Sequence, residues 1–145
     1  LVGALKFHAA LPAADVMAAH IAANLPAWLR AADAALVSVP AAPGRRRARG
    51  FDPALVLTRA LARRIDRPLS TCLVRRGRTT RQVGASRSAR RAPGRIVVRV
   101  RGSPPARAIL VDDVHTTGAT LDACARALAT AGTTVVAAIS YARTL

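Results

Sequence analysis

The residues best suited to chemistry lie between Ile109 and Thr120, where the chain reads ILVDDVHTTGAT. Apolar residues are followed by two adjacent carboxylates, Asp112 and Asp113, and then by threonines and Gly118 at the start of a predicted helix. The free amides and positive dipole end of such a helix, with the threonine hydroxyls, suit a phosphate monoester, and glycine lets the backbone approach it closely. The carboxylates can accept hydrogen bonds from a vicinal diol or hold a hydrated divalent cation. Phosphate and diol together describe a ribose 5-phosphate.

Local capping is the simplest alternative, in which Asp112 and Asp113 close a turn and the threonines cap the helix. The acidic strand end of a P-loop nucleotidase is a second alternative, but the chain has no GxxxxGK[ST] segment and its only lysine is Lys6. The GxGxxG fingerprint of dinucleotide-binding proteins is also missing. His115 is interpreted as a loop residue, with an acid–base role as the alternative.

The elements around this stretch form a strand, helix, strand unit. Ala108–Val111 is a continuous apolar strand, the apolar spacing over Gly118–Ala131 predicts a helix that Gly132 ends, and Thr134–Ile139 is a second strand. This alternation predicts an α/β fold with a mostly parallel twisted sheet and helices on both faces. In such folds ligands bind beyond the carboxyl ends of the strands.

Weaker patterns precede this unit. Apolar residues recur at helical spacing over residues 13–30, where we expect Pro26 to kink or divide the helix and Trp28 to lie in the core. An Asp-Pro pair at Asp52 predicts a helix over residues 53–66. The other predicted segments are a strand at Ala35–Val39, a loop at Pro43–Arg49, a strand at Leu69–Val74, a polar loop at Arg75–Arg95 and an extended segment at Ile96–Val100.

Positive charge is concentrated in one segment. The sequence has 23 Lys and Arg against 7 Asp and Glu, a formal net charge of +16. Nineteen arginines and two aspartates lie between Arg45 and Arg107, so this segment alone carries +17. The charge predicts a polyanionic partner, either nucleic acid or a phosphorylated metabolite, and a solvated basic face is the alternative.

The composition also limits the class of protein. A length of 145 residues with 52% hydrophobic residues fits a single globular domain. No apolar run reaches the roughly 18 residues needed to cross a bilayer, and the first residues lack the order of a secretory signal, so we expect a cytoplasmic protein without a membrane span. Cys72 and Cys124 stand far apart, and the sequence supports neither a zinc site nor a disulfide framework.

Residues 109–120 resemble the phosphoribosyl pyrophosphate (PRPP) motif of type I phosphoribosyltransferases. The wider pattern is similar to the ComF family of competence-related, amidophosphoribosyltransferase-like proteins. Its other landmarks here are Gly3–Phe7, Val39-Pro40, Arg49-Gly50-Phe51, Arg78-Thr79 with Gln82 and Arg90, and Tyr141-Ala142-Arg143. ComF relatives often carry a zinc module upstream of this fold, which we expect to be removed or naturally missing here.

The resemblance implies a single type I phosphoribosyltransferase-like domain over residues 1–145, with residues 1–30 as a candidate hood and a flexible Arg-rich loop at residues 75–95. Asp112 and Asp113 would be the catalytic residues and bind the ribose hydroxyls. The 5-phosphate would lie against Thr116, Thr117, Gly118, Ala119 and Thr120. The pyrophosphate, with Mg²⁺ as the implied cofactor, would face Pro40, Arg45, Arg46 and Arg47 and the loop residues Arg78, Gln82 and Arg90. No resident metal site is implied.

The chain departs from the ComF pattern in three places. It reads Arg49-Gly50-Phe51-Asp52-Pro53 where relatives usually have Arg-Gly-Phe-Asn-Gln, and His115 replaces an apolar residue. The Asn that usually follows the Gln and Arg landmarks is replaced near Ala92-Pro93. The resemblance implies a phosphoribosyltransferase of the glycosyltransferase class that acts in DNA uptake or competence on an acceptor that the sequence does not name. The alternatives are a competence module whose Arg-rich segment binds single-stranded DNA, and a sensor of PRPP or a related phosphosugar or nucleotide without turnover. A homodimer is a further expectation.

Overall fold

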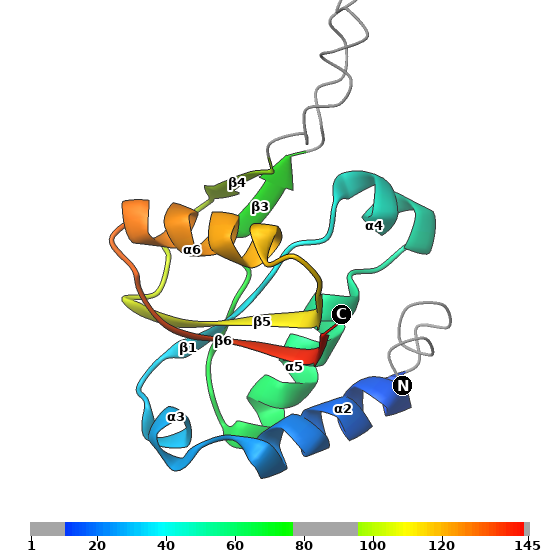
Figure 1. Cartoon of the computed structure of the whole chain (residues 1–145), viewed down its shortest axis with the longest axis vertical. Coiled ribbons are helices and arrows are strands. Elements are labelled where there is room, and N and C mark those ends of the chain that lie inside the picture. The colour runs from blue at the N-terminus through cyan, green and yellow to red at the C-terminus, as the bar shows by residue number, and fades with distance from the viewer. Residues whose placement is uncertain (1–10, 77–95, 144–145) are drawn as a thin grey trace, which may run out of the picture.

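The computed structural model describes residues 11–76 and 96–143. Within these residues the main sheet has four strands in the order β2-β1-β5-β6, and all neighbouring pairs are parallel (Figure 1). The strands are β1 (Ala35–Ser38), β2 (Leu69–Ser70), β5 (Arg107–His115) and β6 (Thr134–Arg143). The predicted parallel α/β sheet is therefore confirmed.

Helices cover both faces of this sheet, as the sequence predicts. Helix α6 (Ala119–Thr130) lies on one face, and α2 (Leu11–Asn24) and α5 (Pro53–Ile65) lie on the other (Figure 1). Successive strand side chains point to opposite faces. Leu110 accordingly joins the apolar cluster under α6, whereas Val111 joins the cluster with α2 and α5. Both faces of β1 and of the first half of β5 are buried, which anchors the carboxyl ends of these strands.

The predicted strand Leu69–Val74 is wrong as a single element. Its first two residues form β2, which pairs with β1, whereas β3 (Leu73–Arg76) pairs antiparallel with β4 (Val97–Val100) in a second, two-stranded sheet. The two sheets are separated at the buried Cys72, whose carbonyl accepts a hydrogen bond from the Arg101 amide at 2.7 Å. The prediction that the polar loop starts at Arg75 is likewise wrong, because Arg75 and Arg76 belong to β3; the rest of that prediction, residues 77–95, lies outside the described residues.

Pro26 divides the first helical segment, as predicted. Helix α3 (Ala27–Ala31) follows it, and the Pro26 carbonyl accepts hydrogen bonds from the amides of Leu29 and Arg30. The prediction that Trp28 lies in the core is wrong, since its side chain is 61% exposed. A helix of little more than one turn turns few positions inward, and Leu29 is the buried one.

Residues Pro43–Arg49 form helix α4 instead of the predicted loop. Proline is well tolerated in the first turn of a helix, where its missing amide costs no hydrogen bond. The helix ends at Gly50, which adopts a φ of 75° and donates its amide to the Arg46 carbonyl at 2.9 Å. Both ends of α4 are thus specified by local backbone chemistry.

Strand β5 is longer than its apolar run. It continues through Asp112 and Asp113 to His115, because β6 extends to Arg143 and keeps pairing with it. The two carboxylates therefore lie on the strand and not in a loop after it. Helix α6 begins close to the predicted position, after Gly118.

Three features of the rest of the described residues bear on the predictions. The described cysteines, Cys72 and Cys124, are free and buried, and burial raises the pKa of the Cys124 thiol to about 12. Within residues 11–76 and 96–143, no helix combines the length and the apolar character that a bilayer crossing needs. The described part of the candidate hood is α2 and α3, and α2 packs against α5.

Candidate functional site

A cleft of about 130 Å³ lies at the carboxyl ends of β1 and β5. The turn after β1, helix α4, the start of α5, strand β3, the end of β5 and the start of α6 all contribute to its wall. The polar and backbone groups of interest are Pro40, Ala41, Ala42, Arg45, Arg49, Asp52, Arg75, Asp112, Asp113, Thr116 and Thr120. The cleft therefore occupies the position where parallel α/β sheets bind ligands.

Asp112 is the most perturbed titratable group of this cleft. Its Oδ1 atom accepts a hydrogen bond from the Asp113 amide at 2.8 Å. Burial, together with the side-chain hydrogen bond to Asp113 and the charge of the Asp113 carboxylate, raises the pKa of the Asp112 carboxyl from 3.8 to about 7. The Asp113 amide opposes this rise, and the charge of Asp52 adds to it. Such a carboxyl can accept or donate a hydrogen bond near neutral pH, which suits the binding of hydroxyl groups.

Asp52 connects two segments of the cleft wall. Its Oδ2 atom accepts a hydrogen bond from the Ala41 amide at 2.9 Å, in the turn after β1. Its Oδ1 atom accepts from the amides of Ala54 at 3.1 Å and Leu55 at 3.5 Å, which caps α5 as predicted. The same carboxylate thus fixes the turn after β1 relative to the start of α5.

Three arginines supply the positive charge of the cleft. Arg45 and Arg49 come from α4, one helical turn apart, and Arg75 comes from β3. None of these three guanidinium groups forms an ion pair with a carboxylate among the described residues. Their charge is therefore available to an anion that enters the cleft.

A second, smaller cavity of about 30 Å³ adjoins the cleft where β5 turns into α6. Its lining residues are Asp112, Val114, His115, Thr116, Gly118, Thr120 and Leu121. The amides of Thr116, Thr117 and Gly118 donate no hydrogen bond to any described residue, and the Ala119 amide has one long contact of 3.4 Å to Thr117 Oγ1. Backbone donors at a helix N-terminus are thus open to an anion.

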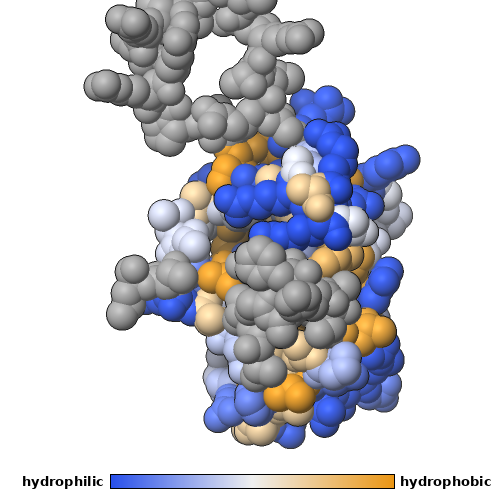
Figure 2. Space-filling model, turned by 90° about the vertical axis from the view of Figure 1, so that its right-hand side faces the viewer, coloured by the Kyte–Doolittle hydropathy of each residue, from blue (hydrophilic) through white to orange (hydrophobic). Residues whose placement is uncertain are grey.

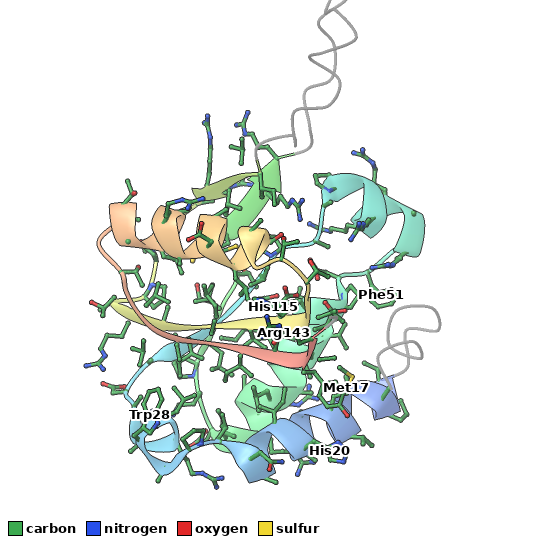
Figure 3. All side chains as sticks on the ribbon, viewed as in Figure 1. Met17, His20, Trp28, Phe51, His115 and Arg143 are labelled. Carbon is green, nitrogen blue, oxygen red and sulfur yellow. The ribbon has the colours of Figure 1, made fainter. Side chains whose placement is uncertain are left out.

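Gly118 adopts a φ of 79°, a conformation that favours glycine. A Cβ atom at this position would lie 3.0 Å from Cε1 of His115. The imidazole of His115 therefore lies against the glycine turn, at the margin of the smaller cavity. In Figure 3, His115 and Arg143 lie together at the carboxyl ends of β5 and β6, in agreement with their register, and Phe51 lies on the same side of the molecule.

The structure brings together many of the residues that the sequence singled out. Around the cleft and the adjoining cavity it places Pro40, Arg45, Asp112, Asp113, Thr116, Gly118 and Thr120. Arg46 and Arg47 are exposed on α4 and line neither space. Thr117, in the turn before α6, and Ala119, its first residue, are also exposed and line neither space. Arg78, Gln82 and Arg90 lie outside the described residues.

Three polar residues of the cleft were not among the predicted site residues: Arg49, Asp52 and Arg75. A helical interpretation of Pro43–Arg49 would have found the first, because residues four apart share one face of a helix. Arg75 reaches the cleft through the pairing of β3 with β4, which no local pattern indicates.

Figure 2 views the carboxyl edge of the sheet, where strongly hydrophilic side chains gather over α4.

The oxygen-rich donor set of the cleft, with its carboxylates and threonine hydroxyls, is of the kind that Mg²⁺ prefers. Among the described residues, however, no group of three or more His, Cys, Asp or Glu side chains is placed to hold a metal ion. Asp112, Asp113 and the threonine hydroxyls could contribute oxygen ligands to a Mg²⁺ ion whose other ligands come from a bound anion or from water.

Comparison with models of protein families and with curated protein sequences gives no match. Among solved structures, the crystal structure of orotate phosphoribosyltransferase from Aeropyrum pernix is similar to this chain, with a TM-score of 0.48 and 19% sequence identity. The similarity covers 91% of this chain and 70% of that one. The assignment of the α/β fold rests on the sheet order and the covering helices described above.

Proposed function

We propose that the cleft binds phosphoribosyl pyrophosphate with Mg²⁺ and that the protein is a ComF-type phosphoribosyltransferase. The observation that carries this proposal is that Asp112 lines both the small cavity at the open backbone amides and the cleft, where Asp113 and arginines without an ion pair among the described residues also lie. A ribose that carries a phosphate at one end and a pyrophosphate at the other needs these three kinds of group in this order.

Each part of the substrate then has a partner of suitable chemistry. The carboxylates of Asp112 and Asp113 accept hydrogen bonds from the ribose diol. The 5-phosphate lies at the start of α6, against the free amides and threonine hydroxyls of the 116–120 turn. The pyrophosphate faces Arg45 and the turn after β1, with Arg49 and Arg75 as additional cations.

The same arrangement favours departure of the pyrophosphate. Cleavage of the bond between the ribose carbon and the pyrophosphate leaves positive charge developing on the sugar and negative charge on the leaving group. The arginines stabilise the negative charge, and the carboxylates at the sugar stabilise the positive charge. Mg²⁺ bound to the pyrophosphate would further neutralise the leaving group. We propose that the acceptor of the phosphoribosyl group is a nitrogen nucleophile. We also propose that the protein acts in the cytoplasm, in DNA uptake or competence.

A single-stranded DNA interface is the second candidate function. Its support is the set of arginines that are exposed outside the cleft, among them Arg46 and Arg47 on α4 and Arg76 and Arg99 on the small sheet. With 3% aromatic residues, the chain offers few platforms for base stacking, so such binding acts through phosphates and depends steeply on salt.

Thermal melting with PRPP and Mg²⁺ tests the proposal. A ligand at about 100 times its Kd stabilises the folded chain by about 2.7 kcal/mol. For a chain of this size the melting temperature then rises by about 5–10 °C. The double variant Asp112→Ala/Asp113→Ala should fold, as judged by circular dichroism, and show no rise. An unchanged melting curve of the wild-type chain at millimolar PRPP would contradict the proposal.

A further inference from the structure

The turn after β1 already binds an anionic group of the protein itself, the carboxylate of Asp52. The Oδ2 atom of Asp52 accepts a hydrogen bond from the Ala41 amide at 2.9 Å, and Ala41 lines the cleft together with the two carboxylates of β5. A backbone amide in such a turn is a donor that the anionic group of a ligand could also use. The carboxylate of Asp52 therefore stands where an incoming phosphate oxygen would be bound.

Helix capping does not explain the charge of this residue. The Oδ1 atom of Asp52 caps α5 through the amides of Ala54 and Leu55. Asparagine and aspartate are about equally good at this helix position, so a neutral amide would serve α5 as well. The negative charge of Asp52 is therefore not needed for the helix and acts mainly on the cleft.

The charge of Asp52 acts on the cleft interior. Asp52 and Asp112 both line the cleft, and the charge of Asp52 contributes to the raised pKa of Asp112. Within the described residues, Asp52 forms no ion pair with any arginine, including Arg45 and Arg49 of the same cleft. The negative charge of Asp52 therefore repels an anion that enters the cleft between Asp52 and the arginines.

We infer that Asp52 is a built-in competitor of the pyrophosphate group and sets the affinity and selectivity of the cleft for that group. The inference rests on the proposed function. A ligand must displace the Asp52 carboxylate from the Ala41 amide or bind beside its charge, and either route weakens binding. Removal of the charge should strengthen binding of every multivalent phosphate that reaches the turn after β1.

Asp52→Asn is the variant that isolates this effect. The amide oxygen of asparagine keeps the cap on α5, whereas its nitrogen cannot accept a hydrogen bond from Ala41. Asp66→Asn is the matched control, because Asp66 lies at the opposite end of α5, is exposed and adopts a φ of 52° that asparagine tolerates well. Both variants add the same net charge to the protein.

Calorimetric titration with inorganic pyrophosphate and Mg²⁺ provides the measurement. Asp52→Asn should bind about tenfold more tightly than the wild-type chain, as expected for removal of one facing charge at close range. Asp66→Asn should bind like the wild type. Asp52→Ser, which also caps helices without charge, should reproduce the gain if Asp52→Asn is poorly folded.

The outcomes separate this inference from the proposed function. The inference is overturned if Asp52→Asn binds pyrophosphate as tightly as, or more weakly than, the wild-type chain. It is also overturned if Asp66→Asn gains as much affinity as Asp52→Asn. Absence of pyrophosphate binding by every chain also overturns it, since the vacated turn would then hold no anion. A parallel titration of the wild-type chain with PRPP decides the proposed function independently of all these results.

Discussion

The backbone amide of Asp113 donates a 2.8 Å hydrogen bond to Oδ1 of Asp112, so the second carboxylate residue of the pair orients the first. This bond favours the charged form of Asp112, but burial and the Asp113 carboxylate outweigh it and the pKa of Asp112 rises to about 7. The pair is therefore held in position at a cost in free energy. Groups with such perturbed pKa values in a cleft are typical of functional sites.

Replacement of Asp112 by Asn should make the folded chain more stable at alkaline pH. The pKa of Asp112 is near 3.8 in the unfolded chain and about 7 in the folded chain, so the folded state binds this proton more tightly. The stability that the protonated group contributes is therefore lost as the pH rises from about 3.8 to about 7. Asp112→Asn avoids the loss and keeps the acceptor for the Asp113 amide. The free energy of unfolding should exceed that of the wild type by about 1–3 kcal/mol at pH 8.

Urea unfolding from about pH 4.5 to 8 measures this difference, which should shrink toward the acid end. Asp33→Asn is the control, because Asp33 is exposed and makes no ion pair within the described residues. A constant difference across this pH range would show that Asp112 is not the titrating group.

Gly118→Ala should cost more stability than Gly132→Ala. Both glycines have a positive φ, near 79° and 86°, so an alanine at either is strained by about 1 kcal/mol. Only at Gly118 would the new methyl group also meet the His115 ring, at 3.0 Å, whereas the space at Gly132 is open. Unfolding free energies should show the excess, and His115→Ala in the same chain should remove it. An excess that persists without the imidazole would contradict this packing.

The four arginines of α4 should divide into two functional pairs. Arg45→Gln/Arg49→Gln should weaken PRPP binding at least about tenfold, because hydrogen bonds to charged groups contribute about 1.5–3 kcal/mol each. Arg46→Gln/Arg47→Gln removes the same charge outside the cleft and should leave PRPP affinity unchanged. Titration of both variants with PRPP and with single-stranded DNA checks this. Equal losses of PRPP affinity would show that general charge, and not the cleft, determines binding.

Asp52→Ala should destabilise the chain by about 1–2 kcal/mol, since it removes the cap of α5 together with the link to Ala41. Asp52→Asn should cost less than half as much, because the cap survives. Thermal or urea unfolding of the two variants gives the comparison. Equal costs would mean that the Ala41 contact, and not the cap, dominates the stability contributed by this side chain.

Much of the fold could be predicted because local chemistry agrees with the tertiary structure. The apolar strand at Ala108–Val111, the helix after Gly118 and the break at Pro26 each have a strong local signal, and each is found. The loop prediction for Pro43–Arg49 is wrong. It rests on the cluster of arginines, whereas the first-turn proline and the glycine that follows the segment both favour a helix.

Other errors concern contacts between distant segments. The continuation of β5 to His115 depends on pairing with the end of β6, and the division of Leu69–Val74 depends on two different partner strands. Arg75 reaches the cleft for the same reason. In contrast, the carboxylate pair and the threonine turn could be predicted, because strand, turn and helix are contiguous in sequence.

Direct titration with PRPP and Mg²⁺ tests the central claim most directly. The wild-type chain should bind one equivalent of PRPP, and Asp112→Asn/Asp113→Asn should lose that binding while remaining folded. Asp33→Asn/Asp66→Asn, which adds the same net charge at exposed positions outside the cleft, should bind like the wild type. Full affinity in the Asp112→Asn/Asp113→Asn variant, or no binding by the wild-type chain, would contradict the account.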